Sequence, residues 1–326
     1  MTQKYIRPLK IANVECASNT VLAPMAGITD APLRRICLRG GAGLVCAEMV
    51  SANALKFESQ KSFKMLAVNA GERPVSMQIF GGEPEIIAHA AKLAQQQGAD
   101  IIDINAGCPV KKINKAGAGC VLMKDAAKLG AIIAAAVKSV KIPITLKTRI
   151  SLNRADILGP ALCRIAQDNG AAAVTIHARA ALDVHNGPPN LAALEECCKA
   201  VSIPVIGNGG IIDAASAKAM LDCGCAGIMI GRGAIGNPFI FREIAQTLDG
   251  QSAAHITLSE KINLFKELIE ENVKLYGEYT GISRSKKTVG YWVRGFPNAA
   301  ALRMQLVQAQ KLEEAQNILN TLLSTI

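Results

Sequence analysis

Residues 204–238 read PVIGNGGIIDAASAKAMLDCGCAGIMIGRGAIGNP, and this segment decides the predicted fold. It contains two short apolar runs that end in glycine-rich turns. The stretch between them is typical of a helix that begins after Asp213 and ends at a glycine. Both runs are continuous rather than alternating, which indicates strands that are buried on both faces. The segment therefore predicts a strand–helix–strand unit of a parallel sheet.

The same pattern recurs along the whole preceding part of the chain. Helical stretches such as 84–98 and 124–140 separate apolar runs, which begin near residues 20, 43, 75, 100, 143, 172, 204 and 227. Eight strand–helix units over about 230 residues match a TIM barrel in number and size. A doubly wound sheet usually has fewer strands and carries its glycine-rich signature after the first one. We therefore predict an α/β fold, a TIM (β/α)8 barrel.

The character of the sequence changes after about residue 249. The segment 249–257, DGQSAAHIT, has the composition of a linker, and helical patterns follow it, beginning with LSEKINLFKELIEENVKLYG at 258–277. We predict two domains, a catalytic barrel at residues 1–248 and a small C-terminal helical domain at residues 249–326.

Charge is distributed unevenly along this chain of 326 residues, whose net charge is +10. Residues 104–124 contain four lysines and no acidic residue, and residues 279–312 contain six basic residues and no acidic one. Two such stretches favour a phosphate-rich partner over two merely solvated faces.

Other classes of protein are disfavoured by composition. Ten cysteines occur, but no CxxC pair, so the sequence predicts no zinc or other metal site and reduced cysteines in a reducing compartment. The polar start of the chain predicts no secretory signal, and the apolar stretch 129–137 is too short to span a membrane. We expect a cytoplasmic protein that has no membrane partner, and nothing in the sequence indicates an obligate protein partner.

The candidate site residues follow from the fold, because active sites of TIM barrels lie at the carboxyl ends of the strands. The residues that close the apolar runs are Pro24, Met25, Ala26, Gln78, Asn105, Cys108, Lys147, Arg149, His177, Arg179, Asn208, Gly209, Gly210, Gly231 and Arg232.

The last two glycine loops predict a phosphate site that uses backbone N–H groups and a helix beginning near Asn237–Pro238. The stretch GRGAIG also fits a dinucleotide fingerprint. However, it follows the eighth run, and no further strand ending in an acidic residue comes after it.

Two of these residues carry the chemical alternatives. Cys108 stands between a glycine and a proline, with three lysines just behind it, which favours a reactive thiol facing a polyanion over a buried structural cysteine. Lys147 fits either a Schiff-base lysine or a fixed cation beside the electron-rich end of a reduced flavin, to whose ring Gln78 and His177 would add hydrogen bonds.

Several motifs together resemble one family. They are APMAGITDAPLRR, GLVCAEMVSANAL, DINAGCPVKKINKAGAGCVLMKD, PITLKTR, VTIHAR, PVIGNGGI and GIMIGRGAIGNPFIFREI, in this order between about residues 6 and 246. The chain resembles the bacterial tRNA-dihydrouridine synthases (Dus), and within them the subgroup lettered B, or NifR-like.

The resemblance implies an FMN-dependent enzyme that takes electrons from NADPH, or alternatively NADH, and reduces the C5–C6 double bond of a uridine in the D-loop of tRNA. By position, Cys108 would be the proton donor to C5. The residues that would meet the RNA are Asn105, Lys111, Lys112, Arg179, Arg284, Lys286 and Lys287. The residues that would hold the cofactor are Pro24, Met25, Ala26, Gln78, Lys147, His177, Asn208, Gly209, Gly210, Gly231 and Arg232.

Some positions depart from the family pattern. Ala180 stands where a threonine is usual, Pro188-Pro189-Asn190 replace an Ala-acidic-Trp cluster, and Arg284, Lys286 and Lys287 lie where an Arg-Lys-His stretch is expected. The glycine that usually follows the arginine matching Arg149 is also missing from the stretch TRISLN. These positions bear on which uridine is chosen.

Three functions remain open on the residues alone. The first is the flavin-dependent tRNA reductase. The second is another phosphate-binding barrel enzyme, either a Schiff-base lyase using Lys147 or a small-molecule flavin oxidoreductase. The third is an RNA-binding protein with a degenerate barrel.

Overall fold

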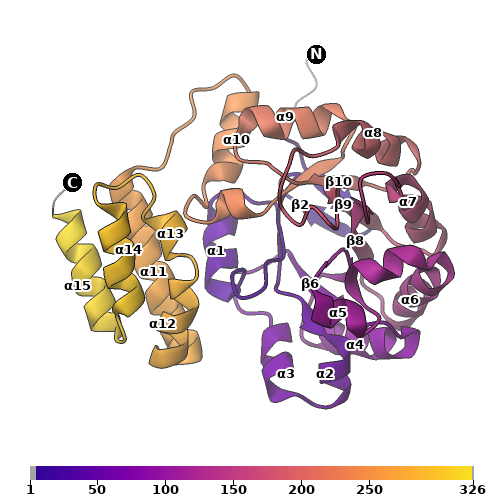
Figure 1. Ribbon diagram of the computed structural model, residues 1–326, viewed down its shortest axis with the longest axis horizontal. Helices are drawn as coiled ribbons and strands as arrows, with labels where there is room; N and C mark the ends of the chain where they lie inside the picture. Colours follow the sequence, from indigo (N-terminus) through magenta and orange to yellow (C-terminus); the bar gives the residue numbers. More distant parts are fainter. Residues whose placement is uncertain (1–4, 325–326) are drawn as a thin grey trace.

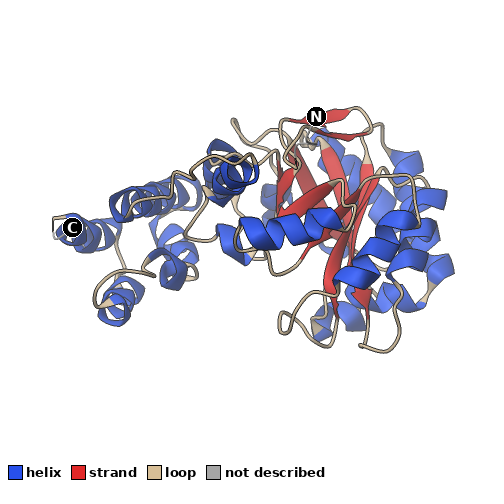
Figure 2. Ribbon diagram, turned by 90° about the horizontal axis from the view of Figure 1, so that it is seen from above, coloured by secondary structure: helices blue, strands red, loops and turns tan. Residues whose placement is uncertain are grey.

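The computed structural model describes residues 5–324 and shows a closed parallel barrel (Figures 1 and 2). Strand β4 pairs with both β3 and β6, which closes the ring, so the predicted TIM barrel is confirmed. Its eight strands are β3 (Thr20–Leu22), β4 (Leu44–Cys46), β6 (Val75–Phe80), β7 (Ile101–Ala106), β8 (Ile144–Ser151), β9 (Ala173–Ala180), β10 (Val205–Asn208) and β11 (Gly227–Ile230).

Helices surround the barrel because its strands are apolar on both faces. Ile102, Ile104 and Ile144 are fully or nearly fully buried, as continuous apolar runs require. The surrounding helices are α1 (Ala31–Arg39), α4 (Pro84–Gln96), α6 (Ala126–Ser139), α7 (Gly159–Asp168), α8 (Leu191–Lys199), α9 (Ala214–Asp222) and α10 (Ile240–Leu248).

Several short elements were not anticipated. A hairpin of β1 (Leu9–Ile11) and β2 (Val14–Cys16) lies at the amino-terminal end of the barrel (Figure 2), where its apolar side chains join those of the strands. The loop after β4 carries β5 (Val50–Ser51), α2 (Ala52–Lys56) and α3 (Gln60–Leu66). The hairpin fills the end of the barrel opposite the carboxyl ends of the strands.

The C-terminal part of the chain is helical, as expected from its pattern. It comprises α11 (Leu258–Tyr276), α12 (Glu278–Lys286), α13 (Val289–Trp292), α14 (Ala299–Gln308) and α15 (Leu312–Leu323). Trp292 stacks on Phe265 with ring centroids 5.3 Å apart and forms part of the core of these helices. Residues 1–4 and 325–326, which belong to the two predicted domains, lie outside the described residues. No helix within residues 5–324 is long and apolar enough to cross a membrane.

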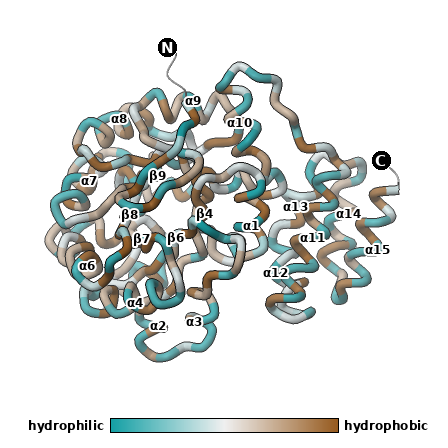
Figure 3. Tube along the Cα trace, turned by 180° about the vertical axis from the view of Figure 1, so that it is seen from behind, coloured by the Kyte–Doolittle hydropathy of each residue, from teal (hydrophilic) through white to brown (hydrophobic). Residues whose placement is uncertain are grey.

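The C-terminal helices pack against α1 of the barrel (Figures 1 and 3). Two ion pairs join α1 to α11, Arg35–Glu271 at 2.7 Å and Arg39–Glu267 at 2.5 Å. A third connection starts at Arg284, whose guanidinium contacts Asp30 and Glu48 of the barrel. These contacts place α12 and α13 beside the carboxyl ends of the strands.

Candidate active site

A cavity of about 460 Å³ lies at the carboxyl ends of the barrel strands. This volume falls within the range of small-molecule sites, about 300–1,000 Å³. Every residue that the sequence predicted as cofactor-binding lines it, together with Cys108, Asn105 and Arg179. The predicted residues Lys111, Lys112, Arg284, Lys286 and Lys287 do not line it.

A hydrogen-bonded chain of side chains forms the floor of the cavity. Gln78 Nε2 donates to Asp103 Oδ2 at 2.7 Å, and Asn105 Nδ2 donates to Gln78 Oε1 at 2.9 Å. Asn105 Oδ1 accepts from the backbone N–H groups of Gly107 and Cys108 at 3.2 and 3.0 Å. Asn105 therefore ties the cysteine loop to strand β7.

Cys108 lies half-buried at the wall of this cavity. Its carbonyl accepts the N–H of Cys120 at 3.0 Å. Burial raises the pKa of the Cys108 thiol, and the backbone N–H of Val110 and the charge of Arg149 only partly oppose that effect. The thiol form is therefore the main species at neutral pH.

Arg149 clamps two loops together beside Cys108. Its Nε donates to the carbonyl of Gly107 at 2.9 Å, and its two terminal nitrogens donate to the carbonyls of Ala180 and Val184 at 3.0 and 2.8 Å. A Cβ at Gly107 would lie 3.1 Å from the backbone carbon of Thr148, so glycine allows this close approach. The sequence marked Arg149 as a strand end but did not indicate its clamping contacts.

Lys147 spans the barrel interior from β8 to β10. Its Nζ donates to Asn208 Oδ1 at 3.0 Å, and Asn208 Nδ2 donates to the carbonyl of Met229 at 2.7 Å. Burial lowers the pKa of Lys147 to about 8, although the charge of Asp103 opposes that shift. Burial also raises the pKa of Asp103 to about 6. Lys147 therefore carries a positive charge at neutral pH and loses it slightly above.

His177 is a neutral imidazole in this setting. Burial is the largest cause of its strongly lowered pKa, and the charges of Lys147, Arg149 and Arg179 lower it further. Its Nε2 lies 3.4 Å from a terminal nitrogen of Arg179, which can only donate, so Nε2 accepts. The ring also stacks on His185, at 5.9 Å between centroids.

The two glycine loops form an electropositive end of the cavity. Gly209 and Gly210 have φ angles of +123° and +73°, and a Cβ at Gly210 would lie 3.0 Å from a terminal nitrogen of Arg179. Arg232 joins Arg179 here, and its charge contributes, after burial, to the lowered pKa of Arg179. Backbone N–H groups and two guanidinium groups thus suit an anion such as phosphate.

One detail of the predicted phosphate site is wrong. The helix expected to begin near Asn237–Pro238 is α10, and it begins at Ile240. A 3-10 turn, η2 (Arg232–Ala234), directly follows Gly231 instead. Between the two elements, Gly236 has a φ of +74° and passes close to the C-terminal helices, where a Cβ would lie 2.5 Å from the carbonyl oxygen of Tyr291. The 3-10 turn therefore borders the cavity at this loop, through Arg232 and Gly233.

The predicted RNA-facing residues divide into two groups. Lys111 and Lys112 are exposed on α5 (Lys111–Lys115), just beyond Cys108, and Lys287 is exposed on the other side of the mouth, with half-buried Lys286 beside it. Arg284 is different, because its guanidinium points inward: its Nε contacts Asp30 Oδ2 at 3.2 Å and its terminal nitrogen contacts Glu48. We therefore assign Arg284 to the contact between helices and barrel rather than to a free basic surface.

Several lining residues lay outside the predicted set, among them His185 and Tyr291. His185 belongs to the loop after β9, and Tyr291 belongs to α13. Neither closes a strand, so no periodic signal marks them. The aromatic residue Tyr291 within a basic stretch was the only available hint.

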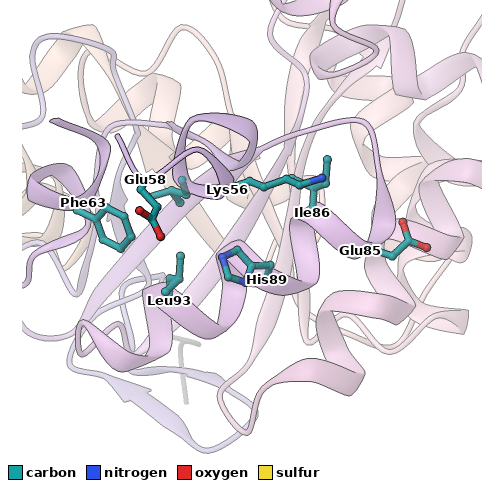
Figure 4. Close-up of a pocket in the computed structure, with 8 residues that line it drawn as sticks. Lys56, Glu58, Phe63, Glu85, Ile86, His89 and Leu93 are labelled. Atoms are coloured by element: carbon teal, nitrogen blue, oxygen red, sulfur yellow. The ribbon is translucent and has the colours of Figure 1, made fainter. Parts of the chain in front are cut away.

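A second hollow, of about 450 Å³, lies between α2, α3 and α4 (Figure 4). Phe63, His89 and Leu93 line it, and Glu58 lies beside Phe63. None of the predicted site residues contributes to it. The convergence of strand-end groups identifies the barrel cavity as the candidate active site.

Comparisons with known proteins agree on one family. The family described as "Dihydrouridine synthase (Dus)" matches residues 21–326. A probable tRNA-dihydrouridine synthase of Rickettsia conorii is 38% identical over 298 residues, which cover 90% of each chain. The tRNA-dihydrouridine synthase B of Pseudomonas aeruginosa is 36% identical over 304 residues, covering 93% of this chain and 92% of the relative. The corresponding protein of Shewanella oneidensis is 38% identical over 287 residues, covering 87% and 89%.

Proposed function

The chain belongs to the dihydrouridine synthase family, and we propose that it is an FMN-dependent tRNA-dihydrouridine synthase that uses NADPH to reduce a D-loop uridine. One observation carries this proposal: one thiol, that of Cys108, shares a cavity with Lys147 and an electropositive glycine-rich end. Lys147 and the glycine-rich end suit a planar cofactor with a phosphate tail. The thiol of Cys108 suits the addition of hydrogen across a double bond, which needs an acid.

The donor set of the cavity fits FMN. Pro24, Met25 and Ala26 offer an apolar wall, and Gly231 lies beside it, since a Cβ there would stand 3.7 Å from the sulfur of Met25. Lys147 supplies a fixed cation for the electron-rich pyrimidine part of the ring. Gly209, Gly210, Arg179 and Arg232 supply donors for the phosphate. When bound, reduced FMN would supply the hydride for C6 of the uracil, and NADPH would reduce the flavin again.

Cys108 supplies the other hydrogen. Its Sγ holds a proton at neutral pH because burial raises the thiol pKa, and the proton passes to C5 of the uracil as negative charge develops there. Asn105 holds the backbone of Cys108 in place during this transfer, and solvent restores the proton to the resulting thiolate. The neighbouring charge of Arg149 eases the temporary formation of that thiolate.

The substrate base has to leave the folded RNA to reach this cavity, as in other enzymes that act on a base. Exposed Lys111 and Lys112 on one side of the mouth and Lys287 on the other would hold the phosphates of the RNA that flank the displaced uridine. Contacts of this kind predict that binding weakens steeply with salt.

The test uses an unmodified tRNA transcript and the purified protein with FMN and NADPH. We expect a yellow protein and the formation of dihydrouridine, detected by mass spectrometry of the digested RNA. A protein that takes up no FMN, or one that leaves every uridine unreduced in tRNA isolated from a strain lacking the gene, would refute the proposal.

The lowered pKa of Lys147 is the one observation that favours a second function, an imine-forming barrel enzyme. Its Nζ is hydrogen-bonded to Asn208 of β10, which opposes attack on a carbonyl. Borohydride trapping of a carbonyl substrate on Lys147 would support this alternative.

A further inference from the structure

Tyr291 is the one residue of the C-terminal helices that lines the barrel cavity, within the part of the chain that the structure describes. It lies on α13, next to Trp292, which is fully buried against Phe265. Gly236 of the loop after β11 passes beneath it, where a Cβ would lie 2.5 Å from the Tyr291 carbonyl oxygen. The backbone of Tyr291 is therefore held on both sides.

The ring of Tyr291 itself remains accessible. The residue is half-buried, and among residues 5–324 no hydrogen bond to its hydroxyl is found. The guanidinium carbon of exposed Arg294 lies 5.5 Å from the ring centroid. An accessible aromatic ring with an arginine beside it is a combination that binds nucleic acid bases by stacking and phosphates by charge.

The position of Tyr291 relative to Cys108 follows from the strand order. In the ring β3-β4-β6-β7-β8-β9-β10-β11, the strand that carries the Cys108 loop is fourth, and β11 is eighth. The Tyr291 backbone packs on the loop after β11, so it borders the cavity across the barrel from the Cys108 loop. A nucleotide chain that crosses the mouth passes between these two walls.

Several polar contacts join the C-terminal helices to the barrel beside Tyr291. Glu48 accepts from the backbone N–H of Gly27 and from Arg284, and Arg284 also binds Asp30, which caps α1. The Nζ of Lys287 lies against the same turn, 2.6 Å from where a Cβ of Gly27 would stand. The C-terminal helices therefore hold Tyr291 at a fixed place beside the loop that carries Pro24, Met25 and Ala26.

We propose that Tyr291 is a positioning residue that stacks on the RNA base next to the displaced uridine. This inference rests on the proposed function, because it requires an RNA strand across the cavity mouth. The stacked neighbour fixes how far the uridine extends into the cavity and thus its approach to Cys108. Recognition depends on the ring and not on the hydroxyl, which has no partner in the described chain.

The test compares Tyr291→Ala and Tyr291→Phe with Tyr279→Ala, each as the full chain loaded with FMN. Tyr279 is a matched control, since it is 81% exposed on α12 and does not line the cavity. The RNA is a D-loop hairpin that carries 2-aminopurine on one side or the other of the uridine, without NADPH. Fluorescence quenching of 2-aminopurine reports stacking directly.

We expect quenching on one side of the uridine with the unaltered protein, with Tyr291→Phe and with Tyr279→Ala. Tyr291→Ala should lose that quenching and weaken hairpin binding by about tenfold or more, as expected for a lost stacking contact. It should also raise KM for tRNA more than it lowers kcat. We also measure the FMN affinity of each variant, because a loss in Tyr291→Ala would indicate that Tyr291 contacts the cofactor and not the RNA.

The inference is overturned if Tyr291→Ala matches Tyr279→Ala in quenching and binding, or if its FMN affinity falls while its hairpin binding does not. Failure of the proposed function has a different signature, because the unaltered protein would then form no dihydrouridine. If the unaltered protein forms dihydrouridine, and Tyr291→Ala and Tyr279→Ala bind the hairpin equally well, only the role of Tyr291 is refuted.

Discussion

The backbone N–H of Cys108 donates to Oδ1 of Asn105 at 3.0 Å. Asn105 lies near the end of β7, so this strand holds the backbone of the residue that we propose as the acid. The same amide oxygen accepts from Gly107, while Asn105 Nδ2 reaches Gln78 and, through it, Asp103. A chain of buried amides thus connects the barrel interior to the cysteine. This arrangement holds the backbone of Cys108 and does not engage its thiol.

Replacing the proposed acid should separate the two halves of the reaction. Cys108→Ala should lower dihydrouridine formation at least about 100-fold, the size expected for loss of a general acid. Oxidation of NADPH in air should continue, because the thiol has no part in it. The matched control is Cys223→Ala, which changes a half-buried cysteine away from the cavity and should leave both rates unchanged. Full activity of Cys108→Ala would remove the acid role.

The raised pKa of the Cys108 thiol has a measurable consequence. Because the thiolate is the nucleophile, alkylation by iodoacetamide should be slow at neutral pH and should rise only above the ordinary thiol range, about pH 8.5. Peptide mass spectrometry at a series of pH values measures the rate at this residue. Rapid alkylation at pH 7 would contradict a protonated thiol.

Lys147 predicts a separate pH dependence. Its pKa is lowered to about 8, so the side chain is charged below that pH and neutral above it. The rate of flavin bleaching by NADPH should therefore fall as pH rises through about 8. Lys147→Arg keeps its charge over this range and should lack that step, whatever its absolute rate. An unchanged step in Lys147→Arg would assign the titration to another group.

The glycine loop should discriminate FMN from riboflavin, which lacks the phosphate. Gly210→Ala introduces a Cβ 3.0 Å from Arg179 at a φ of +73°, so FMN affinity should fall by about tenfold or more while riboflavin affinity changes little. Gly250→Ala is the control for backbone strain, since Gly250 has φ +76° and no atom within 4 Å of a Cβ. Fluorescence titration measures both ligands. Equal losses for FMN and riboflavin would exclude phosphate binding at this loop.

Arg284 should stabilise the contact between the C-terminal helices and the barrel. Arg284→Ala leaves the carboxylates of Asp30 and Glu48 buried without their partner, which should lower the free energy of unfolding by about 3 kcal/mol. Lys199→Ala removes only exposed ion pairs on α8, which solvent screens, and should lower the free energy of unfolding far less. Denaturant unfolding followed by circular dichroism compares them. Equal stability of the two variants would contradict the assignment.

Much of the site could be predicted from the sequence because the active sites of TIM barrels lie at the carboxyl ends of the strands. Gln78, Lys147, His177 and Asn208 each close an apolar run, and all four line one cavity. The expected basic surface was less predictable, because charge along the sequence does not distinguish a side chain in solvent from one paired inside. Arg284 shows this, since its partners Asp30 and Glu48 lie more than 230 residues away in the chain.

The sequence by itself determined the barrel, its eight strand positions and the group of residues at the strand ends. Periodicity and glycine turns are local signals, and the closed parallel ring follows from them. Only the tertiary structure decided that Arg284 points inward, that α10 begins at Ile240 and that Tyr291 borders the cavity. These features depend on how α12 and α13 pack beside the barrel mouth, and contacts between distant segments leave no periodic mark in a single chain.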